Sequence, residues 1–346
     1  MDNKLKVLIV DDTLFMRKAV AQILDSDPDI EVLGSAKNGL EAIQKVKTLM
    51  PDVITLDIDM PVMDGITAIK HIMVESPVPI VVLSSLTNDG IVTFEALRLG
   101  VVDFVPKPSG AISVDIDQSR QQIIDRIKAA HTVNLENVRR VRIDKKWDKD
   151  KRLADLYGYY PLEYLVAIGT TLSGPNTVIR VLSKLSPTIP AALVVIQEIS
   201  PRIIDSFVSE FNKHVPWKVA VARDNLTIEQ GTCYICSNEY SLSLDFNVNG
   251  EPCLKVGEAV PDPLNRFFSS VADMYHENAV GVLLTGIGDD GSDGFERIKK
   301  NSGVTIAQDA NCCVYPNLTN NAIRKGVVDV VIDEVRLSEK IESIMS

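Results

Sequence analysis

The chain has 346 residues, 45% of them hydrophobic and 24% charged, which is the composition of a folded globular protein and, at roughly 150 residues per domain, the length of about two domains. Its formal net charge of −11 argues against a general nucleic-acid binder, because binding phosphate backbones needs a basic face. No apolar run approaches the ~18 residues of a membrane span, and the five cysteines have no framework spacing, so we expect a cytoplasmic protein without membrane insertion.

The first part of the chain, residues 1–131, alternates strand and helix patterns five times. Short apolar runs of the kind that form buried parallel strands cover residues 6–10, 31–36, 53–57, 80–84 and 103–106. Amphipathic helices are predicted at residues 16–25, 39–49, 65–75, 92–99 and about 118–130. Five βα units in about 130 residues predict an α/β domain with a doubly wound parallel sheet.

Charged and polar residues stand where these strands end. Asp11 and Asp12 follow the first strand, Asp57 ends the third, Ser84 ends the fourth and Lys107 follows the fifth. The carboxyl ends of parallel strands meet at one edge of a sheet, where α/β proteins bind their ligands. These five residues therefore predict a site at this edge.

The chemistry of that set points to a metal-assisted phosphoryl transfer. Three carboxylates packed together need a cation, and hard oxygen ligands of this kind suit Mg²⁺. The metal would also neutralise a phosphoryl group, so that Asp57 can act as the nucleophile and become an aspartyl phosphate. Lys107 and the hydroxyl of Ser84 would then contact phosphoryl oxygens.

Four motifs carry a resemblance to the receiver domain of two-component response regulators. They are Val10-Asp11-Asp12, the stretch from Leu56 to Gly65, Leu83-Ser84-Ser85 and Val105-Pro106-Lys107-Pro108. The resemblance covers residues 4–131 and implies a flavodoxin-like fold. It also implies that a sensor histidine kinase phosphorylates Asp57.

The same resemblance assigns further roles within this domain. It implies that Asp12, Asp57 and the backbone of Asp59 hold Mg²⁺ while Asp11 assists. Phe104 stands where the family carries its aromatic switch residue, which works together with Ser84 and Lys107.

A charged linker is predicted at residues 132–164. Its stretch 139–152 has eight basic and three acidic residues, a net charge of +5 in a chain that is acidic as a whole. Two interpretations stay open: a solvated connecting segment, or an electrostatic dock for an acidic partner.

The last part of the chain, residues 165–346, again alternates strands and helices. Apolar strands are predicted at residues 165–168, 192–197, 279–284, 304–307 and 328–331, and helices at 175–185, 201–214, 264–275 and 292–300. Between about 232 and 256 short alternating strands flank an Asn-Gly pair, which predicts a β-hairpin. We expect a second doubly wound, Rossmann-type domain with a small hairpin insertion.

Two loops of this domain have the form of catalytic turns. Residues 168–174 run from a strand through a tight turn into a helix and place the hydroxyl of Thr171 at the strand end, near helix N–H groups. Residues 286–291 form a second such loop, in which Asp290 is placed to orient a histidine. The two histidines of this domain, His214 and His276, end helices that lead into strands, so we expect them at the opposite edge of the sheet.

This domain resembles the catalytic domain of the chemotaxis protein-glutamate methylesterases, through Ile168-Gly169, Val195-Ile196-Gln197, the stretch 278–291 and the stretch 305–309. Enzymes of that family hydrolyse methyl-glutamyl esters and deamidate glutamines on chemoreceptors with a Ser-His-Asp triad. Carried over by position, the serine falls on Thr171, the histidine on Glu198 and the aspartate on Asp290. Of the three, only the aspartate is retained.

The two replacements weigh against hydrolysis. Threonine is stiff at χ1, and a carboxylate with an ordinary pKa near ~4.3 is a poor base for a hydroxyl. Losing triad function typically costs about 10⁴- to 10⁶-fold in rate.

The sequence therefore predicts a chemotaxis-type response regulator that is phosphorylated on Asp57. Its catalytically impaired output domain would act by phosphorylation-controlled binding to a chemoreceptor or a signalling-array protein. The alternative is an active methylesterase or glutamine deamidase that uses Thr171 as its nucleophile.

Overall fold

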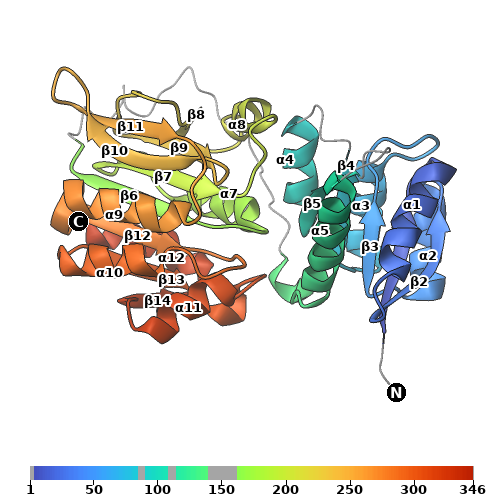
Figure 1. The fold of residues 1–346 in the computed structure, drawn as a ribbon. Coiled ribbons are helices and arrows are strands. Elements are labelled where there is room, and N and C mark those ends of the chain that lie inside the picture. Colours follow the sequence, from blue (N-terminus) through green and yellow to red (C-terminus); the bar gives the residue numbers. More distant parts are fainter. Residues whose placement is uncertain (1–3, 85–89, 108–113, 139–161, 346) are drawn as a thin grey trace. The chain divides into compact units, whose positions relative to one another are not determined.

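The computed structural model describes residues 4–84, 90–107, 114–138 and 162–345 (Figure 1). The chain divides into two compact units, one built largely from the residues up to 140 and the other largely from those that follow. Most of the predicted linker, including its basic stretch 139–152, lies outside the described residues. The two interpretations of that stretch stay predictions.

The first unit contains a five-stranded parallel sheet in the order β2-β1-β3-β4-β5. Its strands are β1 (Leu5–Val10), β2 (Ile30–Ala36), β3 (Val53–Leu56), β4 (Ile80–Ser84) and β5 (Asp103–Pro106). Its helices are α1 (Leu14–Asp25), α2 (Gly39–Leu49), α3 (Gly65–Glu75), α4 (Gly90–Leu99) and α5 (Val114–His131). The strand order and the alternation along the chain confirm the predicted doubly wound fold.

The centre of this sheet explains why Asp57 is held firmly. All four residues of β3 are buried, because the strand lies between β1 and β4 with a layer of side chains on each face. The turn after it is kept close by Gly65 at the start of α3, where an added Cβ would lie 2.3 Å from the backbone oxygen of Asp57. The side chain of Asp64 caps α3 by accepting the Thr67 amide at 2.7 Å. The chain therefore turns tightly around the carboxyl end of β3.

The second unit contains a seven-stranded parallel sheet in the order β14-β13-β12-β6-β7-β9-β8. Its strands are β6 (Tyr164–Gly169), β7 (Ala191–Gln197), β8 (Lys218–Val221), β9 (Thr232–Ser237), β12 (Ala279–Leu283), β13 (Val304–Gln308) and β14 (Val330–Ile332). Its helices are α7 (Gly174–Lys184), α8 (Ile204–Phe211), α9 (Pro263–Tyr275), α10 (Ser292–Lys300), α11 (Asn317–Lys325) and α12 (Glu334–Ile344). Figure 1 shows helices packed along this sheet.

The predicted hairpin is confirmed as an antiparallel pair, β10 (Ser241–Phe246) with β11 (Pro252–Gly257). Leu242 and Leu254 of this pair join a buried cluster that also includes Phe267 and Phe268 of α9. The insertion is therefore part of the core of this unit.

Three elements of the second unit were not predicted. The edge strand β8 has only four residues and begins with an exposed lysine, so it lacks a long apolar run. Helices α11 and α12 are polar segments, with sequences NLTNNAIRK and EVRLSEKIESI. Their helical state depends on packing a few apolar residues, such as Leu318 and Leu337, against the rest of the unit.

Candidate functional site

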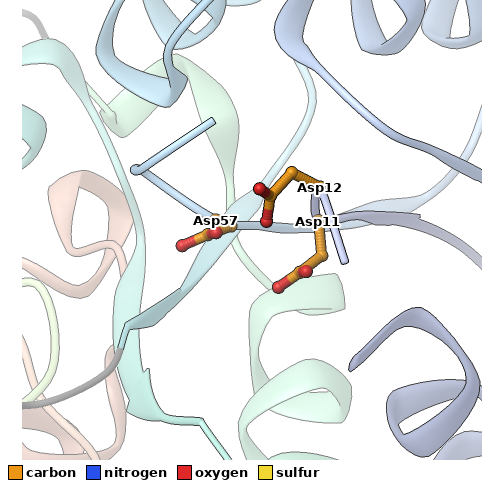
Figure 2. Close-up of side chains that lie close together, drawn as sticks. All are labelled: Asp11, Asp12 and Asp57. Carbon is orange, nitrogen blue, oxygen red and sulfur yellow. The ribbon is translucent and has the colours of Figure 1, made fainter. Parts of the chain in front are cut away.

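The carboxyl edge of the first sheet brings three predicted acids together. Each of Asp11, Asp12 and Asp57 offers a carboxylate oxygen, and these oxygens lie within 4.8 Å of one another. Figure 2 shows the three side chains gathered at the ends of β1 and β3. Asp11 and Asp57 are buried, so their charges are partly removed from water.

Lys107, directly after β5, is the cation of this cluster. Its Nζ lies 2.7 Å from Oδ2 of Asp57 and 2.9 Å from Oδ2 of Asp11. Burial alone would lower the pKa of Lys107, but its bonds to the two carboxylates outweigh burial and raise that pKa. The ammonium group therefore stays charged in this site.

Asp57 is buried and poorly solvated, and its contacts hold its carboxylate in place. Its Oδ1 accepts the Ile58 amide at 2.8 Å, and its own amide donates to Val10 O at 2.9 Å. Burial raises the pKa of this carboxyl, and the nearby charge of Asp11 adds to the rise, while Lys107 opposes it. One carboxylate oxygen is thus fixed by the backbone and the other faces Lys107.

The donor set fits a hard divalent cation. Three carboxylates converge, and Oδ2 of Asp11 is a buried oxygen that accepts no aligned hydrogen bond within the described residues, although Lys107 lies at ion-pair distance. Such an oxygen has a free lone pair for a metal, and clustered carboxylates without a divalent cation repel one another. Asp12 and Asp57 are placed to supply the further oxygens.

The remaining predicted residues of this unit lie at the same edge or next to it. Ser84 ends β4, and its backbone oxygen accepts the Lys107 amide at 2.8 Å, which joins the two strand ends. Phe104 in β5 is partly buried and packs against the core of the unit. Asp59 is exposed and stands outside the group of three carboxylates, so its predicted role through the backbone stays a prediction.

Two residues that contact this cluster were missed from the sequence. Thr13 donates two hydrogen bonds to Oδ1 of Asp11, and Arg17 donates to the backbone oxygens of Asp11 and Asp12. One signal was present, because a basic residue in the first turns of a helix is opposed by the helix dipole and calls for a compensating partner.

In the second unit, Thr171 follows β6 at the carboxyl edge, as predicted, but its hydroxyl is engaged. Oγ1 accepts the Ile287 amide at 2.8 Å and lies 3.1 Å from the Ile287 oxygen, to which it donates. A nucleophilic hydroxyl must give its proton to a base, whereas this proton is directed to a backbone carbonyl. The loop that contains Gly286 and Ile287 therefore holds the side chain in place.

Asp290 binds the start of helix α9. Its Oδ2 accepts the Leu264 amide at 2.7 Å and its Oδ1 accepts the Asn265 amide at 2.9 Å. In return, Oδ1 of Asn265 accepts the amides of Gly291, Asp293 and Gly294 at the start of α10. Burial raises the pKa of Asp290, although these amides lower it. Both carboxylate oxygens are thus used to join two helix ends.

Glu198 follows β7 at the same edge of the sheet. Gly169, the last residue of β6, pairs with Ile196 of β7, so Thr171 and Glu198 each lie just past the ends of neighbouring strands. Its surroundings are acidic, since burial raises the pKa of nearby Glu239 and the charge of Glu198 raises it further, against the effect of Arg202. A carboxylate thus stands where the resemblance places a histidine.

The two histidines of the second unit lie away from this edge. His214 precedes β8 and His276 precedes β12, so both are at the amino ends of parallel strands. His214 is bonded through Nε2 to the side chain of Glu210 at 3.0 Å. Their positions agree with the sequence prediction.

The fold and the acidic edge of the first unit define the class of protein, a response regulator with a receiver domain. Family models bear this out: the response regulator receiver domain matches residues 7–114, and CheB methylesterase matches residues 166–341. The chain belongs to the CheB methylesterase family, and is a response regulator of the chemotaxis type.

Several relatives are similar over almost the whole chain. A protein-glutamate methylesterase/protein-glutamine glutaminase of Caldanaerobacter subterraneus subsp. tengcongensis is 36% identical, covering 98% of this chain and 96% of the relative. A protein of the same name from Pyrococcus horikoshii is 33% identical, covering 99% and 94%. A crystal structure of the Thermotoga maritima CheB methylesterase catalytic domain is 25% identical, with a TM-score of 0.49, and covers 52% of this chain and 98% of that one.

Within the part of the chain that the structure describes, none of the helices is both long and apolar enough to cross a membrane.

Proposed function

We propose that this chain is a phosphorylation-controlled response regulator whose methylesterase-like unit is catalytically impaired and acts by binding. Its domains in this proposal are the receiver at 1–131, the linker at 132–164 and the output domain at 165–346. The matches at 7–114 and 166–341 fall inside the two outer segments and support these boundaries.

The receiver chemistry follows from the geometry at the edge of the first sheet. Bound Mg²⁺, held by Asp12, Asp57 and the backbone of Asp59 with help from Asp11, would neutralise charge on the incoming phosphoryl group. A carboxylate oxygen of Asp57 attacks phosphorus, and the bond to the leaving group, the histidine of a chemotaxis-type sensor kinase, breaks. Lys107 is already 2.7 Å from Asp57 and so lies within reach of the phosphoryl oxygens. Ser84 and Phe104 would then change position and report the modification.

One observation carries the proposal of impaired catalysis. At the carboxyl edge of the seven-stranded sheet, the three triad positions hold Thr171, Glu198 and Asp290, and both histidines of this unit lie at the opposite edge. Without an imidazole, no suitable base accepts the proton of the hydroxyl, and no suitable acid donates a proton to the leaving group. The contacts of Thr171 with Ile287 and of Asp290 with α9 support the same reading.

A second unit that keeps its fold but is impaired in hydrolysis can still act by binding a partner. A partner would be a chemoreceptor or another protein of the signalling array, since relatives of this chain are named for an activity on protein glutamate and glutamine. Phosphorylation of Asp57 would change the affinity by favouring one arrangement of the two domains.

The test is a pull-down of chemoreceptor and kinase assemblies with the full chain, with and without a small-molecule phosphodonor and Mg²⁺. We expect the phosphodonor to change the amount bound by severalfold, and the change to vanish in Asp57→Asn or when Mg²⁺ is chelated. Mass spectrometry of the same samples shows whether Asp57 carries a phosphoryl group. An unmodified Asp57 would contradict the receiver assignment, and a modified Asp57 with unchanged binding would contradict the output assignment.

A second candidate function is active hydrolysis with Thr171 as the nucleophile. Full-length similarity to relatives named protein-glutamate methylesterase/protein-glutamine glutaminase favours it, as does the retained Asp290. Phosphorylation-stimulated turnover of methylated receptor that is lost in Thr171→Ala would establish this alternative.

A further inference from the structure

The start of helix α1 uses its capping residue in an unexpected way. Thr13 occupies the N-cap position, where a hydroxyl normally accepts a helix amide, yet its side chain caps no amide of α1. Instead Oγ1 donates to Oδ1 of Asp11 at 2.7 Å, and the Thr13 amide donates to the same oxygen at 2.8 Å. The hydroxyl therefore serves the acidic cluster rather than the helix.

These two hydrogen bonds determine how Asp11 presents its carboxylate. With Oδ1 held by Thr13, Oδ2 is the oxygen that faces the site, 2.9 Å from Nζ of Lys107. A rotated carboxylate would have to break both bonds. The side chain of Asp11 is thus held in one orientation before any ligand arrives.

Arg17, one helical turn later, fixes the backbone of the same turn. Its Nη1 donates to the oxygen of Asp11 at 2.7 Å and to the oxygen of Asp12 at 2.9 Å. A guanidinium group in the first turns of a helix is opposed by the helix dipole, and the two carbonyl oxygens offset that cost. The contact joins α1 to the two acidic residues that directly follow β1.

We propose that Thr13 and Arg17 are positioning residues that hold Asp11 and Asp12 in the geometry for Mg²⁺. The inference rests on the proposed receiver function and adds two residues that do not themselves contact the metal. Residues that orient metal ligands typically change metal affinity 10- to 100-fold when they are lost.

The experiment is a calorimetric titration of the full chain with Mg²⁺ alone, for wild type and four variants. Thr13→Val removes the hydroxyl at nearly constant volume, and Thr13→Ser restores it. Arg17→Met removes the guanidinium, and Lys18→Met is the matched control, because Lys18 is the exposed neighbour with the same charge. Thermal unfolding of each variant reports any loss of structure independently.

We expect Thr13→Val and Arg17→Met to weaken Mg²⁺ binding about tenfold, and Thr13→Ser to keep it within about twofold. Removing a positive charge by itself favours a cation, so Lys18→Met is expected to leave binding unchanged or slightly tighter. Weaker Mg²⁺ binding in Arg17→Met would therefore result from the loss of positioning, because the loss of charge alone would strengthen binding.

Two results would overturn the inference: unchanged affinity in folded Thr13→Val and Arg17→Met, or a Thr13→Ser variant as weak as Thr13→Val. A wild-type chain that binds no Mg²⁺ would instead refute the receiver proposal on which the inference rests. The two failures are therefore distinguishable in one data set.

Discussion

At the scale of single residues, burial and the charge of Lys107 act in opposite directions on the Asp57 carboxylate. Burial raises the pKa of Asp57, and Lys107 partly reverses this at 2.7 Å. The carboxylate is thereby less solvated than an exposed one while keeping a cation beside it. This combination suits a nucleophile that must accept a phosphoryl group and later release it.

Another residue close to this site is strained. Val62, in the loop between β3 and α3, has a φ of 70° and is 82% exposed. The Met63 amide donates to the oxygen of Pro61 at 2.8 Å and so closes a tight turn around Val62. A β-branched residue in the left-handed region is unfavourable by roughly 1–3 kcal/mol, whereas asparagine tolerates that region well.

We therefore predict that Val62→Asn raises the free energy of unfolding of the first unit by about 1 kcal/mol. The control is Val74→Asn, an exposed position near the end of α3, where valine and asparagine have similar helix propensities and no change is expected. Urea unfolding measures both variants. A Val62→Asn variant less stable than wild type would show that this valine is supported by contacts that offset its strain.

At the scale of elements, Asp290 is a helix-joining residue. It accepts two amides at the start of α9, and Asn265 in α9 accepts three at the start of α10. Charge-assisted hydrogen bonds of this kind contribute about 1.5–3 kcal/mol each when they are not fully exposed. Asp290 thus has a structural role that does not depend on any catalysis.

We predict that Asp290→Ala lowers the free energy of unfolding of the second unit by about 2 kcal/mol, whether or not the domain hydrolyses anything. Asp289→Ala is the matched control, since Asp289 is the exposed neighbour in the same loop and is expected to change stability little. Denaturant unfolding followed by the fluorescence of buried Trp217 monitors this unit. Equal stability of the two variants would refute the structural role.

The elements show what a sequence can and cannot predict. Continuous apolar strands ending in Asp11, Asp57 and Lys107 predicted both the sheet and its acidic edge, because strand ends determine where these residues lie. Asp290 was expected to orient a histidine, but its contacts with α9 depend on tertiary packing of residues 26 and 25 positions away. Thr13 precedes a helix and is typical of a capping residue, so nothing in the sequence indicates that its hydroxyl donates to Asp11 instead.

At the scale of the whole molecule, an acidic receiver site is joined in one chain to a methylesterase-type fold. The carboxyl edge of the first sheet carries the side chains that the proposed phosphoryl chemistry needs. They are three carboxylates, a lysine and a hydroxyl. The carboxyl edge of the second sheet carries Thr171 and Glu198 at two of the three positions where the resemblance places a catalytic triad. The contrast between the two edges is what leads to the proposal of a switch that controls binding.

The most direct test compares methanol release from methylated chemoreceptor by the phosphorylated wild-type chain and by the double variant Thr171→Ser/Glu198→His, with Thr171→Ala as the baseline. We expect wild type to match the baseline and the double variant to exceed it by about 10²-fold, a small part of what a complete triad supplies. Methanol release by wild type well above that of Thr171→Ala would show that the second unit is an active esterase and would overturn the proposal of impaired catalysis.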